Sequence, residues 1–288
     1  MEFLITLING LSLGGVYAMI ALGYTMVYGI AKMLNFAHGD IIMVGGYAIL
    51  VLLSVNPILA IAFSVIFCVA LGVVIEKVAY KPLRGASPLA VLITAIGVSY
   101  LLQSVAQIIF GVAPKFVIVA EFGNLTIGSV NINYGTIITL ICSLAIMAAL
   151  TCFVKFTRVG RAMIAVSEDK DAARLMGVNV NFIIMLTFAI GSALASLAGL
   201  FSLLRVPTIM PTYGALPGIK AFTAAVIGGI GSIPGAMLGG ILLGVVECVC
   251  NSISSIAPYT TAIEFLILIV ILLVKPTGIL GKKRREKV

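Results

Sequence analysis

Ionisable and amide side chains beside long apolar stretches are the first candidates for chemistry in this 288-residue sequence. Asn35, His38 and Asp40 follow one apolar stretch, and Glu247 lies within a later one. Charged groups are costly at the depth of a membrane, so they are retained mainly along substrate or ion pathways. We therefore expect these residues near a translocation path. The alternative for the first three is an interfacial turn in which Asp40 caps the following helix.

Two glutamates lie inside late apolar stretches, at Glu247 and Glu264. Each is expected either to pair with Lys220 or Arg205 or to line the pathway. The alternative for Glu264, which follows Tyr259 closely in the sequence, is a position near the end of a span where its carboxylate reaches water.

The residue sets of an enzyme or a metal site are missing from the sequence. One histidine with one nearby carboxylate is too little for a metal site or a nucleophilic triad. All five cysteines lie in apolar stretches, where cysteine behaves as a small hydrophobic residue, so we expect no disulfide and no metal. No Gly-x-x-x-x-Gly-Lys-Ser/Thr phosphate loop occurs. We expect no cofactor and no catalysis by this chain, and any ATP hydrolysis then belongs to separate subunits.

The composition indicates an all-α, polytopic membrane helix bundle. Hydrophobic residues make up 61% of the chain and charged residues 10%, against roughly 25% charged residues in soluble domains. A helix needs about 20 apolar residues to cross the bilayer. The sequence therefore predicts about eight or nine spans in one transmembrane domain over residues 1–288. The expected spans are 3–22, 41–55, 57–75, 88–111, 134–154, 182–204, 219–233, 235–256 and 259–274.

Two segments of the sequence do not have the pattern of a simple membrane-spanning helix. Residues 23–40 are mostly apolar and predict an additional partial or re-entrant element. Residues 228–235 hold four glycines and a proline, which makes a straight helix unfavourable and predicts a broken helix near the translocation path. The alternative is a short turn outside the membrane. The residues that we assign to the path are Asn35, His38, Asp40, Gly228, Gly229, Gly231 and Glu247.

The distribution of basic residues predicts the orientation. The connections 76–87 and 155–181 and the tail 275–288 together hold 14 of the 18 lysines and arginines, and cytoplasmic segments are rich in these residues. We place these three segments in the cytoplasm and the N-terminus outside, with the first span retained rather than cleaved. Because the basic residues lie between or after the apolar stretches, topology explains the net charge of +8 and nucleic acid is not expected as a partner.

Residues 167–177 predict a short cytoplasmic helix. Ser167 is a good N-cap and Gly177 a good C-cap for a helix of about nine residues. So short a helix is marginal in isolation and needs a surface to pack on, either the body of the protein or a partner.

This segment also resembles a known motif. Asp171-Ala172-Ala173-x-x-x-Gly177 is similar to the EAA loop of ATP-binding-cassette importer permeases, with Asp in place of the usual Glu. The resemblance implies a coupling helix that docks into a groove of an ATPase subunit. The residues that it assigns to ATPase coupling are Arg161, Asp171, Ala172, Ala173, Arg174 and Gly177.

The whole chain resembles the branched-chain amino-acid permease family of these importers, and specifically its LivH-type subunit. The resemblance rests on residues 10–30, 34–40 and 43–47, on 187–191 and on 228–240, in the family's order. It implies an inner-membrane permease for Leu, Ile and Val that works with a second homologous permease, two ABC ATPases and an external substrate-binding protein. A urea-transporting branch, a permease for other amino acids and an ion-coupled secondary transporter remain as alternatives. An intramembrane enzyme is disfavoured, since no catalytic constellation occurs.

Overall fold

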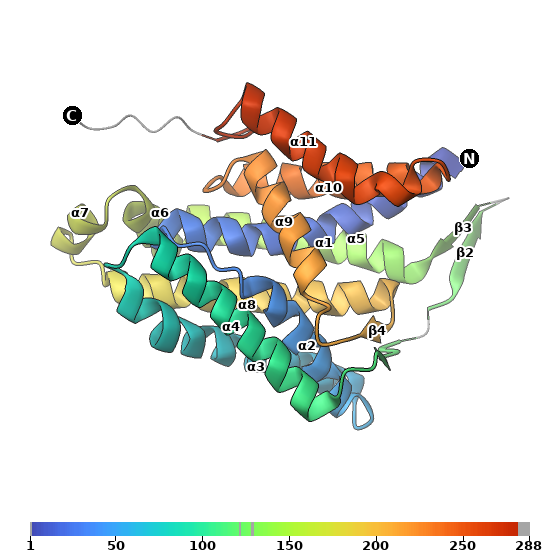
Figure 1. Cartoon of the computed structure of the whole chain (residues 1–288), viewed down its shortest axis with the longest axis horizontal. Helices are drawn as coiled ribbons and strands as arrows, with labels where there is room; N and C mark the ends of the chain where they lie inside the picture. Colours follow the sequence, from blue (N-terminus) through green and yellow to red (C-terminus); the bar gives the residue numbers. More distant parts are fainter. Residues whose placement is uncertain (1, 121, 128–129, 282–288) are drawn as a thin grey trace.

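The computed structural model describes residues 2–120, 122–127 and 130–281, and its described residues form an elongated helical bundle (Figure 1). The helices are α1 (Glu2–Ala31), α2 (His38–Leu53), α3 (Pro57–Ile75), α4 (Pro88–Phe110), α5 (Tyr134–Phe156), α6 (Arg158–Glu168), α7 (Lys170–Leu175), α8 (Val180–Arg205), α9 (Ala215–Gly228), α10 (Ile233–Ser252) and α11 (Thr260–Val274). A π-helical turn, Glu76–Tyr80, and a 3-10 turn, Lys81–Leu83, prolong α3, and a 3-10 turn, Ala257–Tyr259, precedes α11. The predicted all-α, polytopic class is confirmed.

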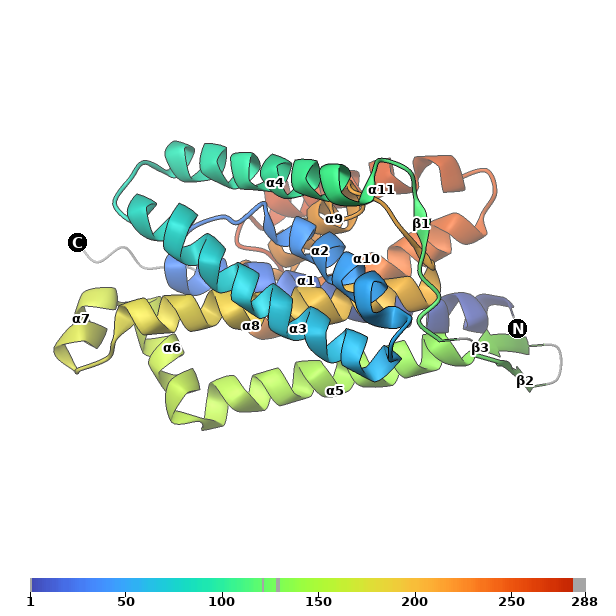
Figure 2. The same cartoon turned by 90° about the horizontal axis from the view of Figure 1, so that it is seen from below.

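The strands of the described residues are short and lie at one end of the bundle, beside the N-terminus (Figures 1 and 2). Strands β2 (Asn124–Ile127) and β3 (Val130–Asn133) form an antiparallel hairpin that leads into α5. Strand β1 (Lys115–Phe116) pairs antiparallel with β4 (Thr208–Ile209), so the connection after α4 is tied to the connection after α8. Helices α6 and α7 lie at the opposite end.

Seven helices are long and apolar enough to cross a membrane in the described part of the chain. They are α1, α3 with its continuation, α4, α5, α8, α10 and the segment Ala257–Val274. Helices α2 and α9 are apolar but have only 16 and 14 residues, which is less than the span length. The structure therefore does not confirm the predicted count of eight or nine spans.

Residues 23–40 do not form a separate element along their whole length. Helix α1 continues without interruption to Ala31 and ends at Lys32, whose φ is +62°. Residues 32–37 are irregular, and α2 begins at the buried residue His38. The predicted boundary at residue 22 is wrong because α1 is the central helix of the bundle, and its second half packs against neighbouring helices instead of ending at a membrane surface.

Helix α1 and helix α10 approach closely through glycines. A Cβ atom on Gly244 would lie 2.2 Å from the backbone nitrogen of Gly14, and one on Gly14 would lie 2.6 Å from the Cα of Ile241. A Cβ on Gly240 would lie 2.4 Å from the Cα of Ala18. Since lipid is as apolar as the side chains, helices in a membrane associate through such close packing rather than by escaping water.

The glycine-rich segment 228–235 is the turn between α9 and α10. Gly229 and Gly231 have φ values of +109° and +92°, which only glycine adopts without strain. Ile279 and Leu280 donate backbone hydrogen bonds of 2.8 and 2.9 Å to the last carbonyls of α9. The turn lies at the end of the bundle that carries α7 (Figure 1). The chain thus follows the short-turn alternative here and not a broken helix.

The two short apolar helices begin against each other. A Cβ atom on Gly214 would lie 2.1 Å from the carbonyl oxygen of Gly39, and one on Gly218 would lie 2.9 Å from the Cα of Gly39. Gly39 is in the first turn of α2, and Gly214 precedes α9 directly. Glycine at these positions lets the two helix starts touch backbone to backbone inside the bundle.

The α1–α10 crossing leads to the first prediction. We expect Gly244→Leu to lower the stability of the purified protein by about 1–3 kcal/mol or more, because the new side chain meets backbone and not a movable side chain. Gly97→Leu is the matched control, since a Cβ at Gly97 of α4 meets nothing within 4 Å. Thermal unfolding in detergent measures both, and equal unfolding temperatures for the two variants would contradict the tight crossing.

Candidate functional site: coupling helices and buried polar groups

Helices α6 and α7 form a helical corner that projects beyond the bundle at the end opposite the N-terminus (Figure 2). Thr157 caps α6 by accepting a hydrogen bond of 2.9 Å from the backbone N–H of Gly160. Asp169 separates the two helices and caps α7, with its Oδ1 accepting from the backbone N–H groups of Asp171 and Ala172 at 2.9 and 3.0 Å. These caps satisfy backbone donors that have no partner inside a helix.

The predicted cap at Ser167 is wrong. Ser167 lies inside the last turn of α6, where its hydroxyl donates 2.7 Å to the carbonyl oxygen of Ile164. Buried Met163 and Val166 hold this turn of α6 against the bundle, so the chain stays helical through Ser167 and breaks two residues later. Helix α7 therefore has six residues and not about nine.

The predicted C-cap at Gly177 is confirmed. Gly177 has a φ of +81°, and its N–H donates 2.9 Å to the carbonyl of Arg174. The N–H of Val178 reaches back to the carbonyl of Ala173 at 3.0 Å. A left-handed residue at this position lets the chain reverse and enter α8 while the last carbonyls of α7 are satisfied.

The residues of the EAA-like motif face two directions. Ala173 is buried against the bundle, whereas Asp171, Ala172 and Arg174 are exposed, as is Arg161 on α6. The 3.4 Å ion pair between Arg174 and Asp171 is exposed and adds little stability.

Two large apolar side chains follow on the outer side of this corner. Leu175 is 89% exposed and Met176 is 84% exposed. They lie at the end of the bundle and outside the long apolar helices, so lipid does not account for them in the way that it accounts for the exposed side chains of α4. Exposed apolar groups of this kind mark interaction surfaces.

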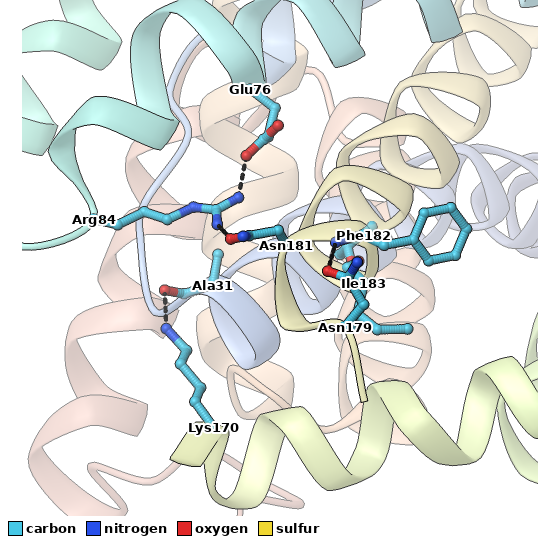
Figure 3. A network of polar contacts seen from close by, with 9 residues as sticks. Ala31, Glu76, Arg84, Lys170, Asn179, Asn181, Phe182 and Ile183 are labelled. Carbon is cyan, nitrogen blue, oxygen red and sulfur yellow. Dashed lines mark hydrogen bonds and ion pairs between the residues drawn. The ribbon is translucent and has the colours of Figure 1, made fainter. Parts of the chain in front are cut away.

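A polar network fixes the base of α7 to the bundle (Figure 3). Lys170 Nζ donates 3.0 Å to the carbonyl oxygen of Ala31, the last residue of α1, where a cation also suits the helix dipole. Arg84 joins Glu76 of the π-helical turn to Asn181 of α8. Burial, followed by the positive charges of Arg84 and Arg174, lowers the pKa of Lys170.

Asn35 and His38 serve packing and hydrogen bonding between helices. The hydroxyl of Tyr80 donates 2.8 Å to Asn35 Oδ1, and both residues are buried. The ring of His38 packs edge-on against Tyr24 at a centroid distance of 4.8 Å and occupies the space that a side chain on Gly23 would need.

Asp40 does not cap α2. The residue before the helix is Ala37, without a side-chain cap, and Asp40 is the third residue of α2. Its Oδ1 accepts a hydrogen bond of 2.9 Å from Gln103 Nε2 on α4, and the side chain is buried. The alternative of an interfacial N-cap is therefore wrong, because the carboxylate is turned inward toward α4.

Glu247 and Glu264 share one buried lysine. Lys220 Nζ of α9 lies 2.9 Å from Glu247 Oε1 of α10 and 3.2 Å from Glu264 Oε2 of α11. The hydroxyl of Tyr17 on α1 donates 2.7 Å to Glu247 Oε2. The predicted pairing with Lys220 is confirmed. We name these four residues the buried ionic cluster; it joins four helices.

The remaining predictions for these two glutamates were an ion pair with Arg205 and, for Glu264, contact with water. Arg205 donates 3.0 Å to the backbone carbonyl of Asn9 and is not the partner of either glutamate in an ion pair. Glu264 has no exposed surface, so the alternative in which it reaches water is wrong. Among the residues that the structure describes, no three His, Cys, Asp or Glu side chains gather as a metal site would require.

Three partners of these groups were not among the sequence candidates: Tyr17, Tyr80 and Gln103. Each is a polar side chain inside or next to a predicted apolar stretch, which is the signal that could have identified them. Gln103 is the clearest case, since it lies well inside the 88–111 stretch.

Long apolar helices, charges paired between helices, and a capped helical corner outside the bundle define a multi-pass membrane protein of the permease class. Residues 6–273 match the family "Branched-chain amino acid transport system / permease component", and the chain belongs to that family.

Curated relatives align over nearly their full length. The chain is 43% identical over 303 residues to the high-affinity branched-chain amino acid transport system permease protein BraD of Pseudomonas aeruginosa, covering 100% of this chain and 98% of that protein. It is 41% identical over 302 residues to the permease protein LivH of Escherichia coli, covering 99% and 98%. A probable branched-chain amino acid transport permease protein LivH of Methanocaldococcus jannaschii is 29% identical, covering 91% and 88%.

The buried ionic cluster leads to the second prediction. Lys220→Met leaves two carboxylates without their cation, so we expect a loss of about 3–5 kcal/mol in stability, seen as a lower unfolding temperature in detergent. Adding Glu264→Gln to Lys220→Met removes one stranded charge and is expected to restore part of that loss. Lys155→Met, at an exposed position on α5, is the control. A double variant less stable than the single one would refute a role of the cluster in charge compensation.

Proposed function

We propose that the chain is the membrane subunit of an ATP-driven importer that carries branched-chain amino acids inward across the cytoplasmic membrane. Its membership of the permease family supports this function over residues 6–273. The names of BraD and LivH favour leucine, isoleucine and valine as substrates over urea.

The observation that carries the proposal is the helical corner formed by α6 and α7. Its base is tied to α1 by Lys170, and its outer side presents Leu175 and Met176, which the described residues of the chain leave exposed. The sequence has no phosphate loop, so the energy of ATP has to reach it from another subunit. An ATPase docked on this corner fits both facts. Two such ATPases, a second homologous permease and an external binding protein complete the proposed importer.

We place α7 in the cytoplasm and the N-terminus outside. The connection that contains α6 and α7 and the connection between α3 and α4 lie at the same end of the bundle, and both are rich in lysine and arginine. Six further basic residues lie in the tail 275–288, which we place in the cytoplasm as well. Residues 282–288 of that tail lie outside the described residues.

An ion-coupled secondary transporter is the second candidate, and buried charges favour it. Glu247, Glu264 and Asp40 are carboxylates inside the bundle, of the kind that proton- or sodium-coupled carriers use. Such a carrier moves its substrate without an ATPase and stops when the ion gradient collapses, whereas the proposed importer depends on ATP alone.

The third prediction tests these alternatives with the complete importer in proteoliposomes. We expect L-leucine uptake to require ATP and the loaded binding protein, and to be unchanged by ionophores that collapse proton and sodium gradients. Leu175→Glu places a charge on the exposed tip of α7 and is expected to abolish binding of the ATPase and to reduce uptake at least about tenfold, while the protein still inserts and folds.

The matched control is Ala86→Glu, which adds the same charge at an exposed position in the connection between α3 and α4, and that connection lies at the same end of the bundle as α7 (Figure 2). It should bind ATPase and transport normally. Leucine uptake by this chain without ATP would count against the importer. Normal uptake by Leu175→Glu would count against docking of the ATPase at α7.

The fourth prediction concerns orientation. In sealed cells, Met176→Cys at the tip of the α6–α7 corner should stay unlabelled by an impermeant thiol reagent, because we place it in the cytoplasm. Thr126→Cys, exposed on the β2–β3 hairpin at the other end, should label readily above the background of the parent chain. The reverse pattern would invert the proposed topology.

A further inference from the structure

Asp40 is a buried carboxylate without a cation. Its Oδ1 accepts a hydrogen bond of 2.9 Å from Gln103 on α4, and Gln103 also donates 3.3 Å to the hydroxyl of Ser99 on the same helix. The ion pairs formed by the described residues do not include it. This sets Asp40 apart from Glu76, Glu247 and Glu264, each of which has a basic partner inside the bundle. A buried charge without a partner is expensive, so a cationic ligand at this position would be bound favourably.

Asp40 also lines a cavity of 330 Å³ between α4 and α9, a size typical of sites for small molecules. The carboxylate and Gln103 give one part of the wall its polarity. Leu92 and Ile96 of α4 and Ile219 of α9 make another part apolar. The cavity is therefore suited to a small molecule that carries a positive group and a compact hydrocarbon chain.

The starts of two helices complete the wall. Gly39 of α2 and Gly214 and Gly218 at the beginning of α9 line the cavity, and the close contact between these glycines brings both helix starts into its wall. Helix α9 has neither a side-chain cap nor an acidic residue in its first turn. The N–H of Ala215 is already bonded to the carbonyl of Thr212, and Pro217 has no N–H, so the start of α9 acts on a negative group of the same ligand through its dipole rather than through hydrogen bonds.

We propose that this cavity binds the permeating amino acid as a zwitterion, with Asp40 receiving its ammonium group and the start of α9 its carboxylate. Leu92, Ile96 and Ile219 then surround the branched side chain. The inference rests on the proposed function and deepens it, because it names the residues that select an α-amino acid inside the permease itself.

A purely structural role for Asp40 predicts a different outcome. In that case the dipole of α2 and hydrogen bonding from α4 stabilise the buried negative charge of Asp40, and the cavity holds lipid or a side chain of a partner subunit. Substitutions that remove the charge or fill the cavity would then either impair assembly of the complex or have no effect. They would not change the preference between leucine and valine.

The test uses the complete importer in proteoliposomes with its binding protein, and L-leucine and L-valine as probes. Asp40→Asn keeps the shape of the side chain and removes its charge, so leucine import per ATP hydrolysed is expected to fall at least about tenfold with assembly intact. Ile96→Phe fills the apolar part of the cavity and is expected to reduce leucine import more than valine import, because valine is one carbon shorter.

Ile93→Phe is the matched control, since Ile93 lies on α4, outside the set of residues that line the cavity, and is exposed; its leucine-to-valine ratio should equal that of the parent. Should Asp40→Asn fail to assemble, the ratio measured for Ile96→Phe decides. Parental import by Asp40→Asn, or an unchanged ratio in Ile96→Phe, would overturn the site and leave the importer standing. A parental complex that imports neither amino acid with ATP would instead overturn the proposed function.

Discussion

Close backbone contact between helices is the constraint on which this structure depends. In lipid, apolar side chains gain nothing by leaving one apolar surrounding for another, so the helices are held by dispersion forces that act only at short range. Small residues make the approach possible at several crossings. A Cβ on Gly72 of α3 would lie 2.0 Å from Ser192 Oγ of α8, and one on Gly199 of α8 would lie 2.7 Å from the carbonyl oxygen of Ile42 on α2. Close backbone contact at glycines also holds α10 against α1, and this contact keeps α1 at the centre of the bundle.

Several polar groups inside this packing find their partners on other helices, because water is absent from the bilayer core. Tyr80 bonds Asn35, and Lys220 compensates two glutamates from different helices. These contacts cost desolvation and so are weak evidence for stability, but each ties together helices that apolar packing alone would leave free to slide. Asp40 differs, since a hydrogen bond holds it while its charge stays without a cation, and it faces a cavity.

Helix α1 connects the two regions of functional interest. Its last residue, Ala31, accepts the hydrogen bond from Lys170 at the base of α7, and its Tyr24 lines the cavity beside Asp40. A displacement of α7 by a docked ATPase would therefore act on a helix that also forms a wall of the proposed substrate cavity. The π-helical turn Glu76–Tyr80 lies on the same route, since Arg84 joins Glu76 to α8 and Tyr80 holds the segment between α1 and α2.

The sequence by itself determined the features that depend on local composition. Apolar stretches of span length predicted the helical membrane class, and a glycine after a short helix predicted the left-handed turn at Gly177. Charges inside apolar stretches predicted partners for Glu247 and Glu264, although the sequence left Lys220 and Arg205 as equal choices. The family resemblance, carried by motifs along the whole chain, was confirmed by the match over residues 6–273.

Tertiary structure alone decided which local signal prevailed where two competed. Ser167 and Asp169 are both good caps, and burial of Met163 and Val166 against the bundle kept Ser167 helical, so that Asp169 became the cap. Helix α1 runs to Ala31 and Asp40 turns toward Gln103 for a similar reason: their partners lie on helices distant in sequence. Hydropathy and capping describe a residue and its near neighbours, whereas the free energy of a buried polar group depends on which helix lies opposite, and only the packed bundle fixes that.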